Sequence, residues 1–407
     1  MRSRDGPAYG WVVLGAFTFN YSLVDISILT LGLLLPDISA EFSLSPSQQG
    51  WLASSVLFAN LIFEIPANLW LSRYRPWRVA SISFLLAALF VVLSGWAPTF
   101  TLLLVTRLAL GLAYLCSKVP RTLVILQWVP RKQIALANGI MFSVIDGLGG
   151  IGFIVIPFIM VGLGGWRNTL YAWAGACLFA SVTWLILGRD RVTPEYSTAL
   201  RSQVKTPLGT ILRYKEPWIL GFGLGGAIAA RFAFSAFWPT FAQNEYGIAL
   251  TYSGLIIGVM SFASMPAKVG VTILPFLVDR TPMVLVACGL GMWATFLGFL
   301  YIGSLPALFL MGVLNGVSFS FIPLVMTRIY NLPGIKPREV TVAVALMFTL
   351  LWAGGALGPL LAGLVQEATD DLRLGLVITS FGSLSLSLSG LALLGMGRRE
   401  SGGALER

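Results

Sequence analysis

The sequence predicts an all-α membrane protein whose twelve transmembrane helices form two six-helix bundles related by pseudo-two-fold symmetry. Hydrophobic residues make up 57% of the 407 residues and charged residues only 11%, and the mean hydropathy is +0.83. Soluble domains carry about 25% charged residues, so this composition argues against a water-soluble fold. Apolar runs long enough to cross a hydrocarbon layer, about 20 residues each, recur along the whole chain.

Each apolar run is expected to be one helix, because helices and closed barrels alone satisfy backbone polar groups in lipid and continuous runs of this length are helical. The first six helices are expected at residues 9–35, 47–71, 77–96, 100–124, 134–161 and 166–188. The second six are expected at residues 217–242, 250–276, 283–304, 306–329, 339–365 and 374–396. The chain therefore divides into an N-terminal bundle (1–188), a basic cytoplasmic linker (189–216) and a C-terminal bundle (217–407).

The loop charges predict the orientation, since Lys and Arg concentrate in cytoplasmic loops. With the N-terminus inside, the cytoplasmic residues include Arg73, Arg75, Arg78, Arg131, Lys132, Arg280, Lys336, Arg338, Arg398 and Arg399. The opposite loops then hold Asp37, Glu41, Glu245, Glu367, Asp370 and Asp371, with only Arg167 and Arg373 as bases. We therefore expect both termini in the cytoplasm, in the cell (cytoplasmic) membrane, with the first helix retained and not cleaved as a signal peptide.

Several classes of partner and cofactor are disfavoured. The net charge of +10 comes largely from basic residues in short loops between apolar runs, so we expect a lipid bilayer and no nucleic acid. Cys116, Cys177 and Cys288 fall inside apolar runs without metal-ligand spacing, so neither a metal nor a cofactor is expected. The chain has no histidine; an enzyme is therefore disfavoured, and any proton coupling must use carboxylates.

Two buried charges occupy matching places in the two halves, Asp25 in the first predicted helix and Arg231 in the seventh. A charge at that depth costs roughly 2.5–3.5 kcal/mol on insertion scales. Opposite charges at equivalent points of a repeated architecture indicate a polar pathway, and hence a carrier of small solutes.

Several local motifs accompany this plan. The segment LVDR (277–280) follows the eighth helix, and Arg107 with Gly111 forms R-x-x-x-G in the fourth. The segment GLGGIG (147–152) opens a Gly-rich stretch that ends near Pro157. Together with the six-plus-six topology, these residues resemble the major facilitator superfamily over essentially the full length.

The stretch 70–78 keeps the basic residues of the family's loop motif but has Ser72 where the family usually has Asp. Pro282 also departs from that motif, so the cytoplasmic latch that it forms in relatives is expected to differ here. The resemblance implies gating roles for Arg73, Asp279 and Arg280, to which we add Lys118, and it implies a monomer.

In the family that the chain resembles, helices 1, 4, 7 and 10 line a central cavity. Asp25 lies roughly 21 Å from the cytoplasmic end of its helix, and Arg107 about 10 Å from the outer face, at 1.5 Å per residue. Asp25, Arg107 and Arg231 are therefore expected in one polar cluster. We assign proton coupling to Asp25 and Arg107, together with Glu64 and Asp146.

Polar stripes on otherwise apolar helices are expected to face away from lipid. One stripe joins Asn60, Glu64 and Asn68, a second Ser261, Ser264 and Lys268, and a third Arg231, Ser235 and Trp238. In the N-terminal helices acids offset the deep cations, whereas Arg231 and Lys268 have no deep acid opposite them. Their expected partner is the solute, since arginine grips a carboxylate through two parallel hydrogen bonds. The predicted substrate contacts are Arg231, Lys268, Tyr114, Trp238, Trp352 and Asn315.

Structural readings of the same residues stay open. Lys118 and Arg121 can reach the cytoplasmic interface by snorkelling, and Glu64 can serve only to neutralise Lys118. Asp146 can be a packing contact in a Gly-rich interface, and Arg107 can stabilise helix packing.

The leading hypothesis is a secondary active transporter that works by alternating access, a proton-coupled symporter of a small organic anion. One alternative is proton-driven efflux of lipophilic or cationic compounds, with Asp25 and Glu64 attracting the cation. A second is a membrane sensor or assembly factor that keeps the carrier fold without transport.

Overall fold

The computed structural model contains helices joined by turns and loops, and no strands, over the residues it describes, which are 7–71, 73–130, 133–191, 212, 214–273, 280–330, 332 and 337–405. Within this part of the chain, twelve helical segments are long and apolar enough to cross a membrane. The predicted fold class and the number of spans are therefore confirmed.

The helices cluster into two compact units. The first unit, residues 1–44 and 55–205, contains the helices α1 (Pro7–Leu29), α2 (Leu31–Phe42), α3 (Pro46–Leu71), α4 (Pro76–Trp96), α5 (Phe100–Trp128), α6 (Ile134–Leu163) and α7 (Trp166–Leu187). Residues 45–54, the start of α3, cluster with the second unit. Most of the predicted linker lies outside the described residues.

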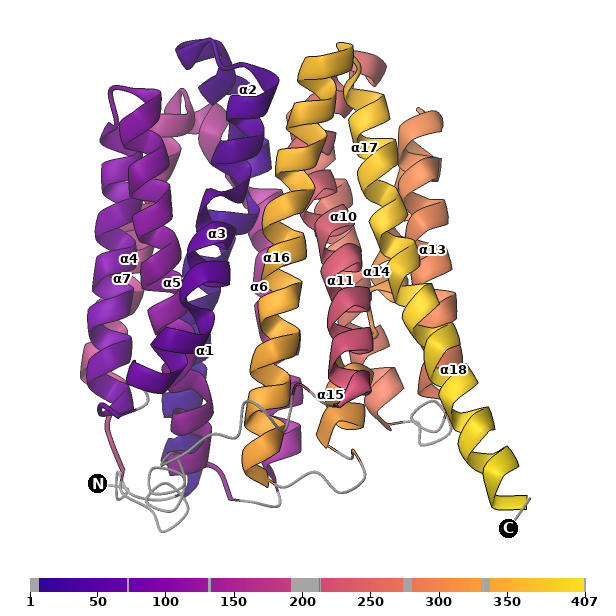
Figure 1. The fold of residues 1–407 in the computed structure, drawn as a ribbon. Coiled ribbons are helices and arrows are strands. Elements are labelled where there is room, and N and C mark those ends of the chain that lie inside the picture. The colour runs from indigo at the N-terminus through magenta and orange to yellow at the C-terminus, as the bar shows by residue number, and fades with distance from the viewer. Residues whose placement is uncertain are drawn as a thin grey trace. The chain divides into compact units, whose positions relative to one another are not determined.

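The second unit, residues 45–54 and 206–407, contains the helices α10 (Lys215–Tyr246), α11 (Leu250–Ile273), α13 (Thr281–Tyr301), α14 (Leu305–Ser318), α15 (Ile322–Tyr330), α16 (Pro337–Thr369), α17 (Leu372–Ser380) and α18 (Leu384–Leu405). A single 3-10 turn, η2 (Phe381–Ser383), joins α17 to α18. Figure 1 shows the long helices α10 and α16 side by side.

The first predicted helix, 9–35, is interrupted at Thr30. Thr30 directs both its amide and its hydroxyl to the Ile26 carbonyl, at 3.0 and 2.6 Å, and side-chain bonding of this kind bends helices. The chain continues as α2, which reaches beyond the predicted end to Phe42. A hydropathy pattern does not register this interruption, because the apolar run continues through it.

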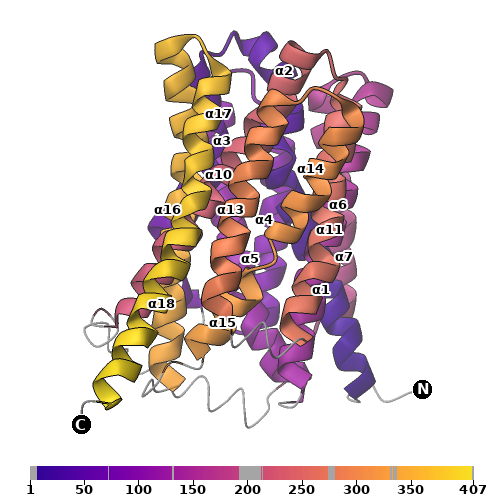
Figure 2. The same cartoon turned by 90° about the vertical axis from the view of Figure 1, so that its right-hand side faces the viewer.

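The tenth predicted helix, 306–329, is also two helices, α14 and α15, drawn as separate segments in Figure 2. Pro323 lies in the first turn of α15; it has no amide hydrogen, and its ring would clash with the carbonyl of Phe319 in a continuous helix. The chain instead tightens at the end of α14, where the Phe319 amide donates to both Asn315 and Gly316. Phe319 is thereby placed at a break in the middle of a candidate span.

Glycine lets α10 and α16 approach closely. A Cβ at Gly354 of α16 would overlap the Gly225 carbonyl of α10, and a Cβ at Gly358 would overlap the Ala229 carbonyl. Small residues at such contacts let backbones pack closely where lipid supplies no hydrophobic drive between helices. In the first unit Gly111 does the same, since a Cβ there would lie 2.7 Å from the Val56 carbonyl of α3.

Replacing Gly354 by alanine should destabilise the protein by about 1–3 kcal/mol, the usual cost of overpacking, because the obstacle is backbone and cannot swing aside. Gly270→Ala is the matched control, since a Cβ there meets nothing within 4 Å. Thermal unfolding in detergent should show a lower midpoint for Gly354→Ala and an unchanged or raised one for Gly270→Ala. Equal midpoints would contradict this packing.

Ion pairs join helix ends in each unit. Arg167 at the start of α7 donates to Glu41 at 2.6 and 3.0 Å and to the Gly95 carbonyl at 2.7 Å. Trp166 donates to the other carboxylate oxygen of Glu41 at 2.7 Å. In the second unit Arg373 pairs with Glu245 at 2.7 Å. The two bases predicted among the acidic loops thus each hold one of the acids.

The Arg167 guanidinium, with help from Trp166, lowers the pKa of Glu41 below its usual 4.5. Glu41 lies beyond the first candidate span. A lowered folded-state pKa gives stability that is present above pH 4.5 and lost as pH falls through the folded-state value. The melting temperature of wild type should therefore exceed that of Glu41→Gln at pH 7, with a gap worth about 1 kcal/mol or less for this exposed pair. The gap should close below pH 4.5, and a gap that widened in acid would contradict the assignment.

Candidate functional site

In the first unit, Asp25 of α1 is the end of a hydrogen-bond chain. Tyr21 donates to the Tyr114 hydroxyl at 2.7 Å, and Tyr114 donates to Asp25 Oδ1 at 2.7 Å. Tyr21 lies four residues before Asp25, on the same face of α1, and Tyr114 projects from α5. Both tyrosines are buried, whereas Asp25 is partly exposed. The two tyrosines therefore hold the Asp25 carboxylate in place while part of its surface stays exposed.

A second acid lies on the same side of α5. Lys118 Nζ contacts Glu64 Oε2 at 2.9 Å, with side chains only 13% and 11% exposed. Asn68 donates to the Glu64 side chain at 3.4 Å and to its carbonyl at 2.7 Å. Since this lysine is shielded and paired, it does not snorkel to the interface as the structural reading allowed. Breaking such a pair on one side leaves a buried charge, which costs about 3–5 kcal/mol.

Tyr114 belongs to both groups. The Lys118 ammonium lies 5.4 Å from the centroid of the Tyr114 ring, whose hydroxyl bonds Asp25. Asp146 and Lys118 also act electrostatically on Asp25. Asp25, Tyr114, Glu64 and Lys118 thus form one cluster, which we name the acid cluster. The sequence predicted Tyr114 as a substrate contact; the structure places it on the predicted proton carrier.

Arg107 does not join the acid cluster in the described residues. Arg107 is 2% exposed and donates from Nη1 to the Ser27 carbonyl at 2.8 Å, while its Nε has no hydrogen-bond partner in the part of the chain that the structure describes. Ser27 lies in the last turn of α1, where the helix dipole favours a cation and the break at Thr30 frees carbonyl groups. The predicted contact of Arg107 with Asp25 is absent here because each has a different partner.

In the second unit, Arg231 of α10 is held by α14. Its Nη1 donates to Asn315 Oδ1 at 3.3 Å, and Asn315 Nδ2 donates to Thr295 of α13 at 2.7 Å. Asn315 is fully buried, so both its amide atoms are committed to fixing Arg231 relative to α13 and α14. Arg231 itself is partly exposed. Asn315 is therefore a positioning residue for the guanidinium.

Phe319, at the break between α14 and α15, lies against two cations. The Arg231 guanidinium carbon is 5.2 Å from the centroid of its ring, and the Lys268 ammonium of α11 is 5.1 Å from it. Such contacts with an aromatic ring are favourable by about 0.5–2 kcal/mol. Arg231 and Lys268, predicted from separate helices to meet the same solute, do converge on one side chain. We name these three residues and Asn315 the cation cluster.

The remaining residues that were predicted to bind the solute or to act in gating either lie outside the two clusters or fall outside the described residues. Trp238 is fully buried, stacks on Phe234 and packs against Phe299, so it belongs to the core of the second unit and offers a ligand no surface. Trp352 is 8% exposed. Of the predicted gating residues, Arg73 and Arg280 are exposed, and Asp279 lies outside the described residues.

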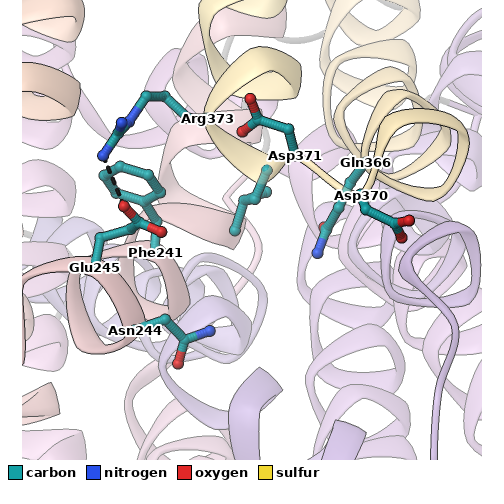
Figure 3. Close-up of a pocket in the computed structure, with 8 residues that line it drawn as sticks. Phe241, Asn244, Glu245, Gln366, Asp370, Asp371 and Arg373 are labelled. Atoms are coloured by element: carbon teal, nitrogen blue, oxygen red, sulfur yellow. Dashed lines mark hydrogen bonds and ion pairs between the residues drawn. The ribbon is translucent and has the colours of Figure 1, made fainter.

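A separate shallow cavity of about 190 Å³ lies among the ends of α10, α16 and α17, away from the residues predicted to bind the solute. Figure 3 shows Arg373 and Glu245 paired on one side of it, with Asp370 and Asp371 on the other. Asp371 is occupied in capping α17 through the Leu374 amide, at 3.1 Å. Ligand pockets usually measure about 300–1,000 Å³, so this cavity is too small to hold a typical ligand.

Phe319 and Thr295 were not among the predicted site residues, and Tyr21 had been considered only as an aromatic contact in the alternative of efflux. Pro323, four residues after Phe319, favours a break there but does not require one, because proline also lies inside α3, α5 and α10. Tyr21 was detectable from its four-residue spacing to Asp25. Thr295, which fixes Asn315, gave no signal, because a threonine inside an apolar helix is ordinary. No group of three or more potential metal-ligating side chains occurs among the residues that the structure describes.

Two charged clusters on membrane-spanning helices, one acidic with tyrosines and one cationic, are typical of a multi-pass membrane transporter. Similarity to known proteins agrees with the assignment to membrane transporters. The family model described as Major Facilitator Superfamily matches residues 17–359, and the chain belongs to that family.

Among similar proteins is the "Probable sulfoacetate transporter SauU" of Cupriavidus necator, 22% identical over 95% of this chain and 91% of that protein. Monocarboxylate transporter 11 of Homo sapiens is 24% identical over 93% of this chain and 81% of its own length. A solved bacterial homologue of the human lysosomal transporter Spinster shares the fold, with a TM-score of 0.76 and 17% identity over 94% of this chain and 96% of that one.

Proposed function

We propose that this protein is a proton-coupled symporter of small organic anions that carry a carboxylate. The observation that supports it most is the convergence of Arg231 and Lys268, from two different helices, on Phe319 at a helix break. Non-helical backbone at membrane depth occurs where it is buried in protein or lines a cavity, and discontinuous helices form the substrate sites of many carriers.

The guanidinium of Arg231 binds the carboxylate through two parallel hydrogen bonds, the geometry that the planar arginine fork favours. Asn315 accepts a hydrogen bond from Nη1 and so fixes the direction in which the guanidinium faces the solute. The names of two relatives, a sulfoacetate transporter and a monocarboxylate transporter, are consistent with an anionic substrate.

Asp25 takes and releases the coupling proton in this proposal. Tyr114 donates a hydrogen bond to the carboxylate, and when Asp25 gains a proton that bond must reverse or break. The Tyr114 ring also touches Lys118, so a change at Asp25 reaches the Glu64–Lys118 pair directly. Binding of solute and proton then favours closure of one side and opening of the other, as the two halves move.

The remaining predictions are part of the same proposal. The protein works as a monomer in the cell membrane with both termini in the cytoplasm. Arg107 supports the end of α1 and acts on coupling through it, while Asp146 acts on Asp25 through its charge. Lys118, Arg73, Asp279 and Arg280 contribute to gating.

Uptake by proteoliposomes tests the proposal. Purified protein is reconstituted and offered radiolabelled carboxylates, lipophilic cations and sugars, with an imposed pH gradient, a sodium gradient or no gradient. We expect accumulation of a carboxylate when the outside is acidic, and its loss with a protonophore. Accumulation of cations alone would support export of cationic compounds, and transport of nothing would support a sensor.

A further inference from the structure

The cation cluster holds two cations that are not equivalent. Arg231 comes from α10 and is fixed through Asn315 to α14 and α13. Lys268 comes from α11, where Ser261 and Ser264 precede it on the same face, and it is only 6% exposed. They meet at a third element, the break that carries Phe319. Each cation therefore has its own structural support, and neither duplicates the other.

The shared ring limits how far apart the two charges lie. Since each is within 5.2 Å of the same ring centroid, they are separated by at most about 10 Å. A carboxylate meets an ammonium or guanidinium group at about 2.7–2.9 Å between nitrogen and oxygen. At that upper limit, two such contacts leave room between the anionic groups for a spacer of at most about one to three carbon atoms.

We propose that the transported solute is a short dianion, with one anionic group on Arg231 and the second on Lys268. This inference rests on the proposed function, which requires only one carboxylate. Arginine in the bidentate geometry occupies both oxygens of a single carboxylate, and Lys268, which contacts the same ring as Arg231, supplies a second positive charge for a second anionic group. A sulfonate or phosphonate at that position would satisfy the same point charge, since the ammonium group imposes no planar geometry.

Phe319 keeps the two cations within reach of one molecule. Its ring lies at a place where the backbone is not held in a helix, and it is partly exposed. A charge-assisted hydrogen bond to a carboxylate is stronger than a cation contact with a phenyl ring. A dianion therefore displaces the ring from both cations together, and a monoanion displaces it from one.

A pair of matched ligands tests the proposal: succinate, and succinamate, in which a neutral amide replaces one carboxylate at almost the same size. Affinities are measured calorimetrically on the purified full-length chain at pH 7.5, and malonate with malonamate extends the series to a shorter spacer. We expect wild type to bind at least one dianion about tenfold or more tightly than its monoamide.

Lys268→Gln should reduce that preference to about twofold or less while changing monoamide affinity little, because only the second charge loses its partner. Lys268→Arg should keep the preference, and Lys215→Gln, which removes an exposed lysine at the start of α10, should not alter it. Melting temperatures check that each variant is folded.

The outcomes separate the two proposals. Equal binding of dianions and monoamides would overturn the dianion and leave a monocarboxylate carrier. A preference that persisted in Lys268→Gln would overturn the role of Lys268. Absence of binding for all four ligands would overturn both the inference and the proposed function.

Discussion

Arg231→Ala should lower the initial rate of carboxylate uptake by about 100-fold or more. Two charge-assisted hydrogen bonds, each worth about 1.5–3 kcal/mol, are lost together, and each 1.4 kcal/mol is a factor of ten. Loss of the guanidinium also removes one of the two cations that contact Phe319. The measurement is uptake of radiolabelled substrate into proteoliposomes, normalised to the amount of reconstituted protein.

Two controls distinguish a binding role from a structural one. Arg231→Lys keeps the positive charge but loses the planar guanidinium that makes two parallel hydrogen bonds. We therefore expect uptake to fall about tenfold, mainly through a raised KM. Arg75→Ala removes an exposed arginine before α4 and should transport normally. Full transport by Arg231→Ala at wild-type expression would exclude Arg231 from the site.

The structure differs from the sequence prediction mainly where backbone geometry matters. Twelve spans are predictable because length and hydropathy decide whether a segment crosses a membrane. The breaks at Thr30 and Phe319 are not, because hydropathy is continuous across both. Pro323 favours a break but is not sufficient to predict one, because Pro66 and Pro239 lie inside the unbroken helices α3 and α10. Thr30 acts through a side-chain bond to its own helix.

The charge partners were predictable to different degrees. Glu64 was considered as the residue that neutralises Lys118, and the two form an ion pair. Asp25 and Arg107 were at similar depth, yet each found a different partner. Depth along a helix gives one coordinate only, and the direction in which a side chain points depends on packing. The acceptor of the Arg107 hydrogen bond is the Ser27 carbonyl, a backbone group. A pattern of charged side chains cannot predict a backbone partner.

Tyr114 shows a further limit. From the sequence it was predicted as a substrate contact, because residue type and position do not show which way a side chain points. Its hydrogen bond and its contact with Lys118 both lie within the first unit. The residue therefore links two acids of the proposed proton pathway, an assignment that required side-chain geometry.

Asp25→Asn should abolish proton-driven accumulation while leaving exchange of substrate across the membrane largely intact. Asparagine has nearly the same size and can still accept a hydrogen bond from Tyr114, but it cannot take or release a proton. The cation cluster is untouched, so binding of the anion should persist. Accumulation under an inward proton gradient is measured beside counterflow, in which unlabelled internal substrate drives entry of label without any gradient.

Tyr114→Phe and Tyr21→Phe test whether the hydrogen-bond chain from Tyr21 through Tyr114 to Asp25 supports proton coupling. Tyr114→Phe removes the donor to Asp25 and should reduce accumulation severalfold, whereas Tyr21→Phe removes only the outer donor and should have the smaller effect. A graded loss in the order Asp25, Tyr114, Tyr21, with counterflow preserved in all three variants, is expected because each is one bond further from the titrating carboxylate. If Asp25→Asn concentrates substrate as wild type does, the coupling carboxylate lies elsewhere. Glu64 is then the next candidate, and Glu64→Gln combined with Lys118→Met removes that pair without leaving a buried charge unpaired.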